Sequence, residues 1–249
     1  RGARMLARGI IEVLPAAGRW RLDLPELPEG DRVARILAQQ LPGAEISQLM
    51  PIPRVDFRDF HTGDTLLSTN MRRQLRKASN RLVTDGRAVH IDFTRDDAEI
   101  QQLLPEIERV HVDRDHSTGR PSDLDDAESL QLWRRLIQAC AADGRIEVAT
   151  LTIDGAMAAY VIALPDGRSY RVFDGHFDSS YSRYSPGRLL ESTVLDRALA
   201  DGRYTELDWG SGVASEKLLT FNAFEARTRL QAGSLVPAPR RPQTVAAEV

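Results

Sequence analysis

The chain has 249 residues, of which 42% are hydrophobic and 28% are charged, and its formal net charge is −3. This length fits one large domain, or one domain with part of a second. A charge so close to neutral argues against a general nucleic-acid binder. No stretch approaches the roughly eighteen uninterrupted apolar residues that a membrane span requires, so we expect no membrane span.

Cys140 is the only cysteine, so it cannot form an internal disulfide. A reducing cytoplasm is the compartment that this cysteine usage favours. The chain begins with Arg1 instead of methionine. We therefore expect further sequence to precede it, and the residues present carry no information about a signal peptide.

The first sixty residues contain few predicted elements. Trp20, Leu22 and Leu24 alternate as in a strand, a helical pattern runs over residues 31–41, and a second strand pattern covers residues 46–52. Three elements are too few for a core of their own. We therefore expect residues 1–60 to form an appendage to a larger domain.

A strongly basic helix is predicted over residues 70–86. One stripe is apolar, and the remaining positions are basic: Met71, Leu75, Ala78 and Leu82 against Arg72, Arg73, Arg76, Lys77 and Arg81. The basic face is either solvated, with its aliphatic stems packed on the body, or it forms a cationic wall that contacts an anionic ligand through residues such as Arg76. Both interpretations stay open.

From Val89 onward the pattern predicts one α/β domain. A strand at 89–93 leads to a helix from about Asp96, which Pro105 should kink or split, and a polar loop should begin at His111. A second helix carries Trp133 and Cys140 on its apolar face.

Strands are then predicted at 146–153, 157–164 and 169–177, joined by hairpin turns at Asp154-Gly155 and Asp166-Gly167. A helix and a further strand complete a mixed, mostly antiparallel sheet. We expect helices to cover both faces of this sheet.

The segment that follows the third strand has a well-marked helix start. Ser185 is a suitable N-cap, Pro186 falls at the first helical position, and Gly202 ends the helix. A helix N-terminus after a strand directs backbone N–H groups at its ligand. This position therefore favours an anion such as a pyrophosphate.

Three motifs carry a family resemblance: Tyr184-Ser185-Pro186-Gly187 with Leu189-Leu190, Asp208-Trp209-Gly210, and Glu216-Lys217. At these residues the chain resembles the Gcn5-related N-acetyltransferase (GNAT) superfamily, and most of all its CelD-like branch, which is related to Fem-type aminoacyl transferases. The resemblance implies a GNAT-like acyl-CoA N-acyltransferase domain over 61–235, a partial and degenerate second copy over 1–60, and a tail over 236–249.

The resemblance also implies a donor site and catalytic residues. Acyl-CoA, the expected cosubstrate, would be bound by Phe173, Arg183, Ser185, Gly187, Arg188 and Leu189. Asp174 is the first choice for general base, with Asp178 and Asp208 as alternatives. Lys217 would stabilise the donor phosphate or an oxyanion, and Tyr184 or Tyr181 would protonate the leaving thiolate.

On the acceptor side we expect Arg76, His116, His176 and Asp208. His176, which lies on the donor strand, is also an alternative proton carrier. His111 and His116, with Asp113 and Asp115 between them, form a polar group without a recognised zinc spacing, so no metal is expected. Alternative assignments remain for several of these residues: a turn for Asp174, and a surface salt bridge for Lys217.

Three functions are compatible with these patterns. The first is transfer of an acetyl or longer acyl group from acyl-CoA to a small-molecule amine by direct attack. The second is Fem-like aminoacyl transfer from an aminoacyl-tRNA, which the basic helix favours. The third is a non-catalytic remnant that binds a ligand or partner.

Overall fold

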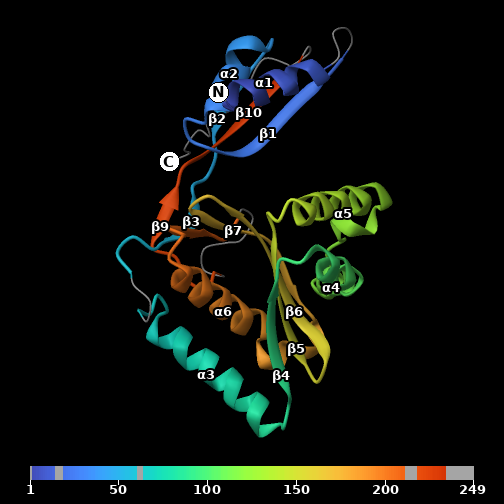
Figure 1. Ribbon diagram of the computed structural model, residues 1–249, viewed down its shortest axis with the longest axis vertical. Helices are drawn as coiled ribbons and strands as arrows, with labels where there is room; N and C mark the ends of the chain where they lie inside the picture. The colour runs from blue at the N-terminus through green and yellow to red at the C-terminus, as the bar shows by residue number, and fades with distance from the viewer. Residues whose placement is uncertain (1, 15–18, 61–63, 211–217, 234–249) are drawn as a thin grey trace, which may run out of the picture. The chain divides into compact units, whose positions relative to one another are not determined.

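The computed structural model describes residues 2–14, 19–60, 64–210 and 218–233 (Figure 1). The chain separates into two compact units. Unit 1 combines the residues up to Ile52 with those from Phe224 onward, and unit 2 spans Pro53–Ala223. These boundaries differ from the expected divisions at 60 and 235, because the last strand pairs with strands near the N-terminus.

Unit 1 contains a three-stranded antiparallel sheet in the order β1-β10-β2. Its elements are α1 (Gly2–Val13), β1 (Arg21–Pro28), α2 (Arg32–Gln40), β2 (Glu45–Gln48) and β10 (Arg227–Gly233). Leu37 of α2 and Leu230 of β10 are fully buried in its core. The Asp31 side chain caps α2 by accepting a hydrogen bond from the Ala34 N–H at 2.8 Å. The origin of this unit as a degenerate copy stays a prediction.

Unit 2 is built on a seven-stranded sheet with the order β4-β5-β6-β7-β8-β3-β9. Its strands are β3 (Ile52–Asp56), β4 (Val89–Thr94), β5 (Glu147–Ile153), β6 (Ala156–Asp166), β7 (Ser169–Phe177), β8 (Glu206–Asp208) and β9 (Ala223–Glu225). β4 to β7 form an antiparallel meander, and β7 pairs with β8 in parallel. The expected mixed, mostly antiparallel sheet is confirmed.

Helices cover both faces of this sheet, as expected (Figure 1). The helical elements are α3 (Thr69–Thr84), α4 (Asp97–Ser117), η1 (Asp123–Asp125), α5 (Ala127–Ala142), η2 (Ser179–Tyr184) and α6 (Pro186–Asp201). On one face α4 and α5 pack on Tyr160 and Ile162 of β6. On the other face α3 and α6 pack on the intervening Ala159, Val161 and Ala163. The alternation of β6 therefore assigns each side chain to one helical layer.

Two local predictions were wrong. α4 is not split at Pro105 but continues to Ser117, because Ile100, Leu104 and Ile107 are all buried on one face and their packing outweighs the lost backbone hydrogen bond; a kink at Pro105 stays a prediction. The polar loop therefore begins about seven residues later than expected. Ser185 does not cap α6: its φ of 52° and ψ of 49° place it in the left-handed region, and its side chain makes no cap hydrogen bond.

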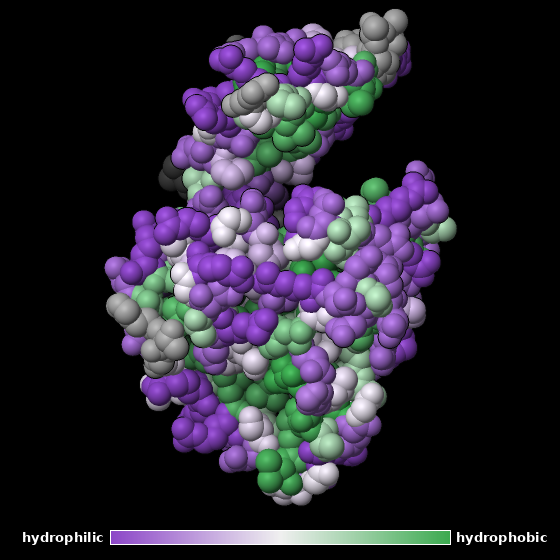
Figure 2. All heavy atoms as spheres, viewed as in Figure 1, coloured by the Kyte–Doolittle hydropathy of each residue, from purple (hydrophilic) through white to green (hydrophobic). Residues whose placement is uncertain are grey.

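Hydrophilic side chains cover much of the visible surface, with apolar side chains showing between them in unit 2 (Figure 2). Val83 at the end of α3 and Val89 at the start of β4 are among the exposed apolar residues. Within the described residues, no helix combines the length and the apolar character needed to cross a bilayer.

Candidate active site

β7 and β8 separate part of the way along β7. The last residue pair between them is Arg171 with Asp208, whereas β7 continues to Phe177. Gly210 turns the chain away with a φ of 78°, and a Cβ added there would lie 3.0 Å from the carbonyl oxygen of Val172. No strand of the described chain pairs with this side of β7 beyond Arg171, so the described pairing of β7 with β8 ends here.

A β-bulge lies in β7 at the point where the strands separate. Ile162 of β6 pairs with Asp174 and Ala163 pairs with Val172, which leaves Phe173 as the extra residue. A bulge of this kind bends its strand and re-aims the side chains that follow. Asp174 and His176 consequently point toward α4, whereas Phe173 is 39% exposed.

The start of α6 packs closely on the end of β7. A Cβ added at Gly187 would lie 3.2 Å from the Phe177 ring, so glycine is needed for this helix-to-strand approach. Leu189 is partly buried against the core of unit 2. Thus the structure gives packing roles to Gly187 and Leu189, two of the residues predicted to bind the donor.

Tyr184 and Arg183 join η2 to the end of α3. The buried Tyr184 hydroxyl donates to Asp85 Oδ2 at 2.7 Å and accepts from Arg87 Nε at 3.3 Å. Arg183 forms an ion pair with the same Asp85 at 2.8 Å. The predicted acid Tyr184 therefore makes structural contacts. Arg188, also predicted for the donor, pairs with Glu191 one turn along α6 at 3.0 Å.

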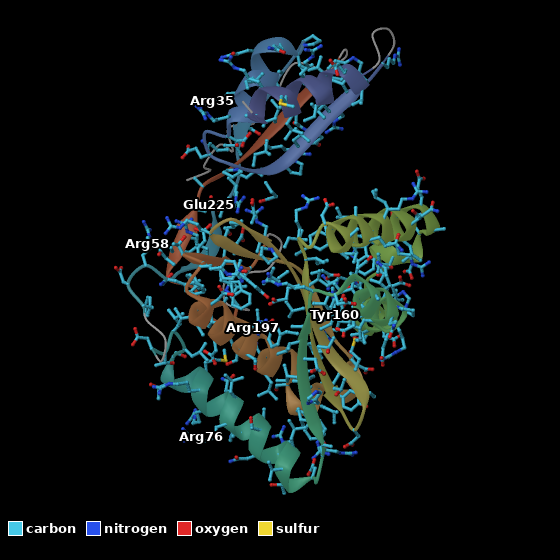
Figure 3. The ribbon with its side chains drawn as sticks, in the orientation of Figure 1. Arg35, Arg58, Arg76, Tyr160, Arg197 and Glu225 are labelled. Atoms are coloured by element: carbon cyan, nitrogen blue, oxygen red, sulfur yellow. The ribbon has the colours of Figure 1, made fainter. Side chains whose placement is uncertain are left out.

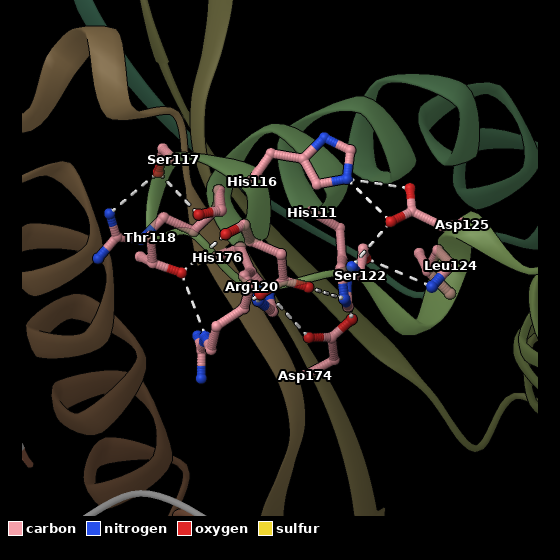
Figure 4. Close-up of polar contacts among 12 residues, drawn as sticks. His111, His116, Ser117, Thr118, Arg120, Ser122, Leu124, Asp125, Asp174 and His176 are labelled. Carbon is pink, nitrogen blue, oxygen red and sulfur yellow. Dashed lines mark hydrogen bonds and ion pairs between the residues drawn. The ribbon is translucent and has the colours of Figure 1, made fainter.

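Five polar side chains meet on the α4 face of β7: His111, Asp115, Tyr160, Asp174 and His176, which we name the His–Asp cluster. Figure 4 labels His111, Asp174 and His176. Tyr160 reaches it from β6 (Figure 3). The two imidazole rings stack with their centroids 4.0 Å apart and their planes at 28°.

Asp174 organises one side of the cluster. Its Oδ2 lies 3.2 Å from His111 Nδ1, and its Oδ1 lies 3.1 Å from His176 Nδ1. The Tyr160 hydroxyl donates to Asp174 Oδ2 at 3.0 Å and lies 3.0 and 3.1 Å from the same two ring nitrogens. Asp115 occupies the opposite side of both rings.

The electrostatics assign different roles to these groups. Burial raises the pKa of Asp174, but hydrogen bonds from His111 and His176 outweigh it and hold the pKa well below its usual range. Asp174 is therefore a weak proton acceptor, which does not favour its predicted role as general base. Burial lowers the pKa of His111, and the hydrogen bond and charge of Asp174 raise it further than burial lowers it. Burial raises the pKa of Tyr160 well above 10.

Two other predicted carboxylates stabilise chain turns. Asp208 is buried, pairs with Arg171 Nε at 3.1 Å, and accepts a hydrogen bond from the Gly210 N–H at 2.8 Å. Asp178 caps η2 through the Ser180 N–H at 2.9 Å. Asp178 also pairs with Arg109 Nη1 of α4 at 2.9 Å.

The remaining predicted residues lie at the edge of this site or away from it. His116 contacts Asp125 at 2.9 Å, and that hydrogen bond raises the pKa of the imidazole (Figure 4). Arg76 lines a groove of about 580 Å³ between α3 and α6, together with Ser192 and Asp196 (Figure 3). Lys217 lies outside the described residues, so its predicted role is untested.

The sequence treatment missed His111 and Tyr160 as partners of His176. One signal was available for His111: it continues the helical spacing of Ile100, Leu104 and Ile107, and it lies four residues before Asp115. Ligand atoms of His111, Asp174 and His176 all lie within 4.8 Å of one another, a grouping that could hold a metal ion. The sequence pattern instead groups His111 with His116, which the structure places against Asp125.

Comparison with known proteins identifies the family. Residues 69–218 match the family described as acetyltransferase (GNAT) domain. Since this match covers more than half of the chain, the protein belongs to the GNAT acetyltransferase family. Membership supports a transferase that carries out acyl transfer. The CelD-like or Fem-like branch stays a prediction.

Solved structures share the fold at low sequence identity. The C-terminal domain of a putative lysylphosphatidylglycerol synthetase from Agrobacterium fabrum is 13% identical, with a TM-score of 0.54 over 92% of this chain and 72% of that one. A conserved protein of unknown function from Bacteroides thetaiotaomicron is 9% identical, with a TM-score of 0.54 over 92% and 75%. No functionally curated protein matches the chain.

Proposed function

We propose that the protein transfers an acetyl or longer acyl group from acyl-CoA to a small-molecule amine by direct attack of the amine on the thioester. The observation that carries this proposal is the open edge of β7 beyond Arg171, where β8 turns away at Gly210. An extended ligand that contains amide groups can pair with a free strand edge through main-chain hydrogen bonds. The pantetheine arm of coenzyme A is such a ligand.

The position of α6 supports an anionic donor. This helix begins at Pro186, shortly after β7 ends, and the Ser185 side chain does not cap it. The positive end of a helix dipole and its backbone N–H groups favour phosphate. We assign the donor pyrophosphate to this end, with Arg183 and Arg188 close to it in the chain.

The chemistry requires a neutral amine next to the thioester carbonyl. An alkylamine with a pKa near 10.4 is only about one-thousandth neutral at pH 7, so a proton acceptor accelerates its attack. Backbone N–H groups near Phe173 would polarise the carbonyl oxygen as negative charge develops on it. Attack then forms the amide and releases coenzyme A.

The test is release of free thiol from a panel of acyl-CoAs and amines. Gly210→Ala should raise the KM for the donor about tenfold, because its Cβ would press on Val172 where the donor arm enters. Gly202→Ala is the matched control: its φ is 71°, but nothing lies within 4 Å of an added Cβ. No thiol release with any pair, together with no binding of coenzyme A, would contradict the proposal.

Aminoacyl transfer from charged tRNA is the second candidate, supported by the exposed basic side chains of α3: Arg72, Arg73, Arg76, Lys77 and Arg81. A face of this kind binds phosphates with an affinity that falls steeply with salt. Salt-dependent binding of charged tRNA, together with no thiol release, would favour this candidate over acyl-CoA. The fold likeness to the putative lysylphosphatidylglycerol synthetase domain is compatible with either donor.

A further inference from the structure

We propose that His176, stacked on His111 and held between Asp174 and Asp115, is the catalytic base that takes the proton from the attacking amine. This inference rests on the proposed acyl transfer and adds to it the group that receives the proton. His176 lies on β7, the same strand whose open edge we assign to the acyl donor. It is also the more exposed ring of the pair, with 20% of its side chain accessible against 13% for His111.

Each aspartate of the cluster faces both rings and uses one oxygen for each. Asp174 contacts the two Nδ1 atoms at 3.2 and 3.1 Å. Asp115 faces the two Nε2 atoms, with Oδ2 3.4 Å from His111 and Oδ1 3.7 Å from His176. Every ring nitrogen is therefore directed at a carboxylate oxygen.

This arrangement determines where the protons lie. An ionised carboxylate only accepts hydrogen bonds, so each Nδ1 that faces Asp174 carries its hydrogen. A neutral ring then keeps its lone pair on Nε2, opposite Asp115. Proton uptake at that Nε2 replaces an unfavourable contact between two acceptors with an ion pair to Asp115. Asp174 therefore selects the tautomer, and Asp115 stabilises the protonated product.

The stacking limits the charge that the pair can hold. Two imidazolium rings with centroids 4.0 Å apart repel each other, so the second proton binds more weakly than the first. The pair therefore holds one added proton more readily than two. We assign that added proton to the less exposed His111.

Groups from every neighbouring element act on this pair. Among the described residues, Asp174 comes from β7, Tyr160 from β6 and Asp115 from α4. Arg120 lies 3.5 Å from Asp115, and the charge of Asp123 in η1 acts on His111. The Trp133 ring of α5 meets the His111 ring edge-on, with the centroids 6.5 Å apart. Negative groups dominate this set. The surroundings therefore favour a cationic or amine ligand over an anionic one.

The reaction step balances as follows. The amine nitrogen uses its lone pair to form the N–C bond to the thioester carbonyl, and the nitrogen proton passes to Nε2 of His176. The C–S bond breaks, and its electron pair leaves with the thiolate of coenzyme A. The proton on His176 is then transferred to the thiolate, which regenerates the neutral ring and gives an amide and a free thiol.

The test is the pH dependence of kcat/KM for the amine in the full chain. On the acidic limb of the profile, kcat/KM should fall about a hundredfold per pH unit, tenfold from the amine and tenfold from the base. His176→Gln should lower kcat/KM about a hundredfold at pH 7 and reduce the dependence to tenfold per unit. Asp115→Asn should move the steeper limb to lower pH, because the protonated ring loses its partner.

His90→Gln is the matched control, since His90 also contacts an aspartate, Asp92 at 2.9 Å, but on the exposed surface of β4. This variant should retain the wild-type kcat/KM at pH 7 and the hundredfold fall of kcat/KM per pH unit. An equal loss of rate at every pH in His176→Gln would indicate a structural role and overturn the assignment.

A second measurement does not depend on turnover. In NMR titrations of the ring protons, the two stacked rings should titrate in coupled steps, and His111→Gln should leave a single uncoupled step, because the neighbouring charge is removed. If the His176 ring titrates identically in the wild type and in His111→Gln, the proposed coupling between the two rings would be overturned. Stoichiometric zinc that survives dialysis, and whose removal abolishes activity, would also overturn the proposal, since both Nδ1 atoms would then be ligands.

The failures are distinguishable. Suppose that the wild-type chain releases thiol and that His176→Gln changes neither kcat/KM nor its dependence on pH. The acyl transfer would then stand, and the assignment of His176 as the base would be overturned. A chain that turns over no acyl donor would overturn the proposed function and the base assignment together, while the titration would still decide whether the two rings are coupled.

Discussion

The role of Asp174 depends on residues that come from other elements. A carboxylate near a strand end has the composition of a general base, but in the fold it accepts hydrogen bonds from His111, Tyr160 and His176. These bonds stabilise its ionised form and weaken it as a base. Its contacts hold the two imidazole rings in one orientation.

Asp174→Asn should lower the free energy of unfolding by about 3 kcal/mol at pH 7, because it leaves two buried histidines without their anionic partner. The pKa of Asp174 is lowered in the fold, so its stabilisation is fully present above its ordinary value of 3.8 and is lost as pH falls below it. The difference in the free energy of unfolding between the variant and the wild type, measured by urea titration, should therefore become smaller from pH 4 to pH 2. The exposed Asp92→Asn serves as control, and equal stabilities at pH 7 would contradict the prediction.

Among the secondary-structure elements, periodicity predicted what depends on local pattern. The strands of the meander and the helix of Trp133 and Cys140 appear close to their expected positions. The pattern did not predict the continuation of α4 past Pro105, because burial of one face decides it, nor the bulge at Phe173, because only pairing with β6 defines it. Both features are needed to bring His111 and His176 together, so the cluster could not be read from the sequence.

Gly187→Val should destabilise unit 2 by about 1–3 kcal/mol, because its Cβ would meet the Phe177 ring at 3.2 Å. Thermal or urea unfolding measures the change. Gly9→Val in α1 is the matched control, since nothing lies within 4 Å of an added Cβ there. Unchanged stability with lost donor affinity would instead place the donor, and not Phe177, against Gly187.

At the scale of the whole molecule, unit 1 is assembled from both ends of the described chain. β10 is the middle strand of its sheet, paired with β1 on one side and β2 on the other. Leu230 and Ala232 of β10 are fully buried in the core of this unit. The two outer strands have no direct pairing with each other, so the sheet depends on the C-terminal segment.

A chain that ends at Ala226 should therefore lose the sheet of unit 1 and keep that of unit 2. Hydrogen exchange should show protection lost in β1 and β2 and retained in β5 and β6. A chain that ends at Gly233 retains β10 and serves as control; it also tests the prediction that residues 236–249 have no core of their own. Protection of β1 after removal of β10 would contradict the expectation.

The interrupted course of unit 1 has a consequence for synthesis on the ribosome. β1 and β2 emerge early, but their partner β10 follows only after all of Pro53–Ala223 has been translated. At roughly 5–20 residues per second, the unpaired strands wait on the order of ten seconds or longer. Unit 2, whose described strands β3 to β8 lie in one continuous segment, can complete its meander during that interval. Vectorial synthesis thus makes unit 2, which contains the residues that match the GNAT domain, the first to fold, and the unit that contains the N-terminal strands the last.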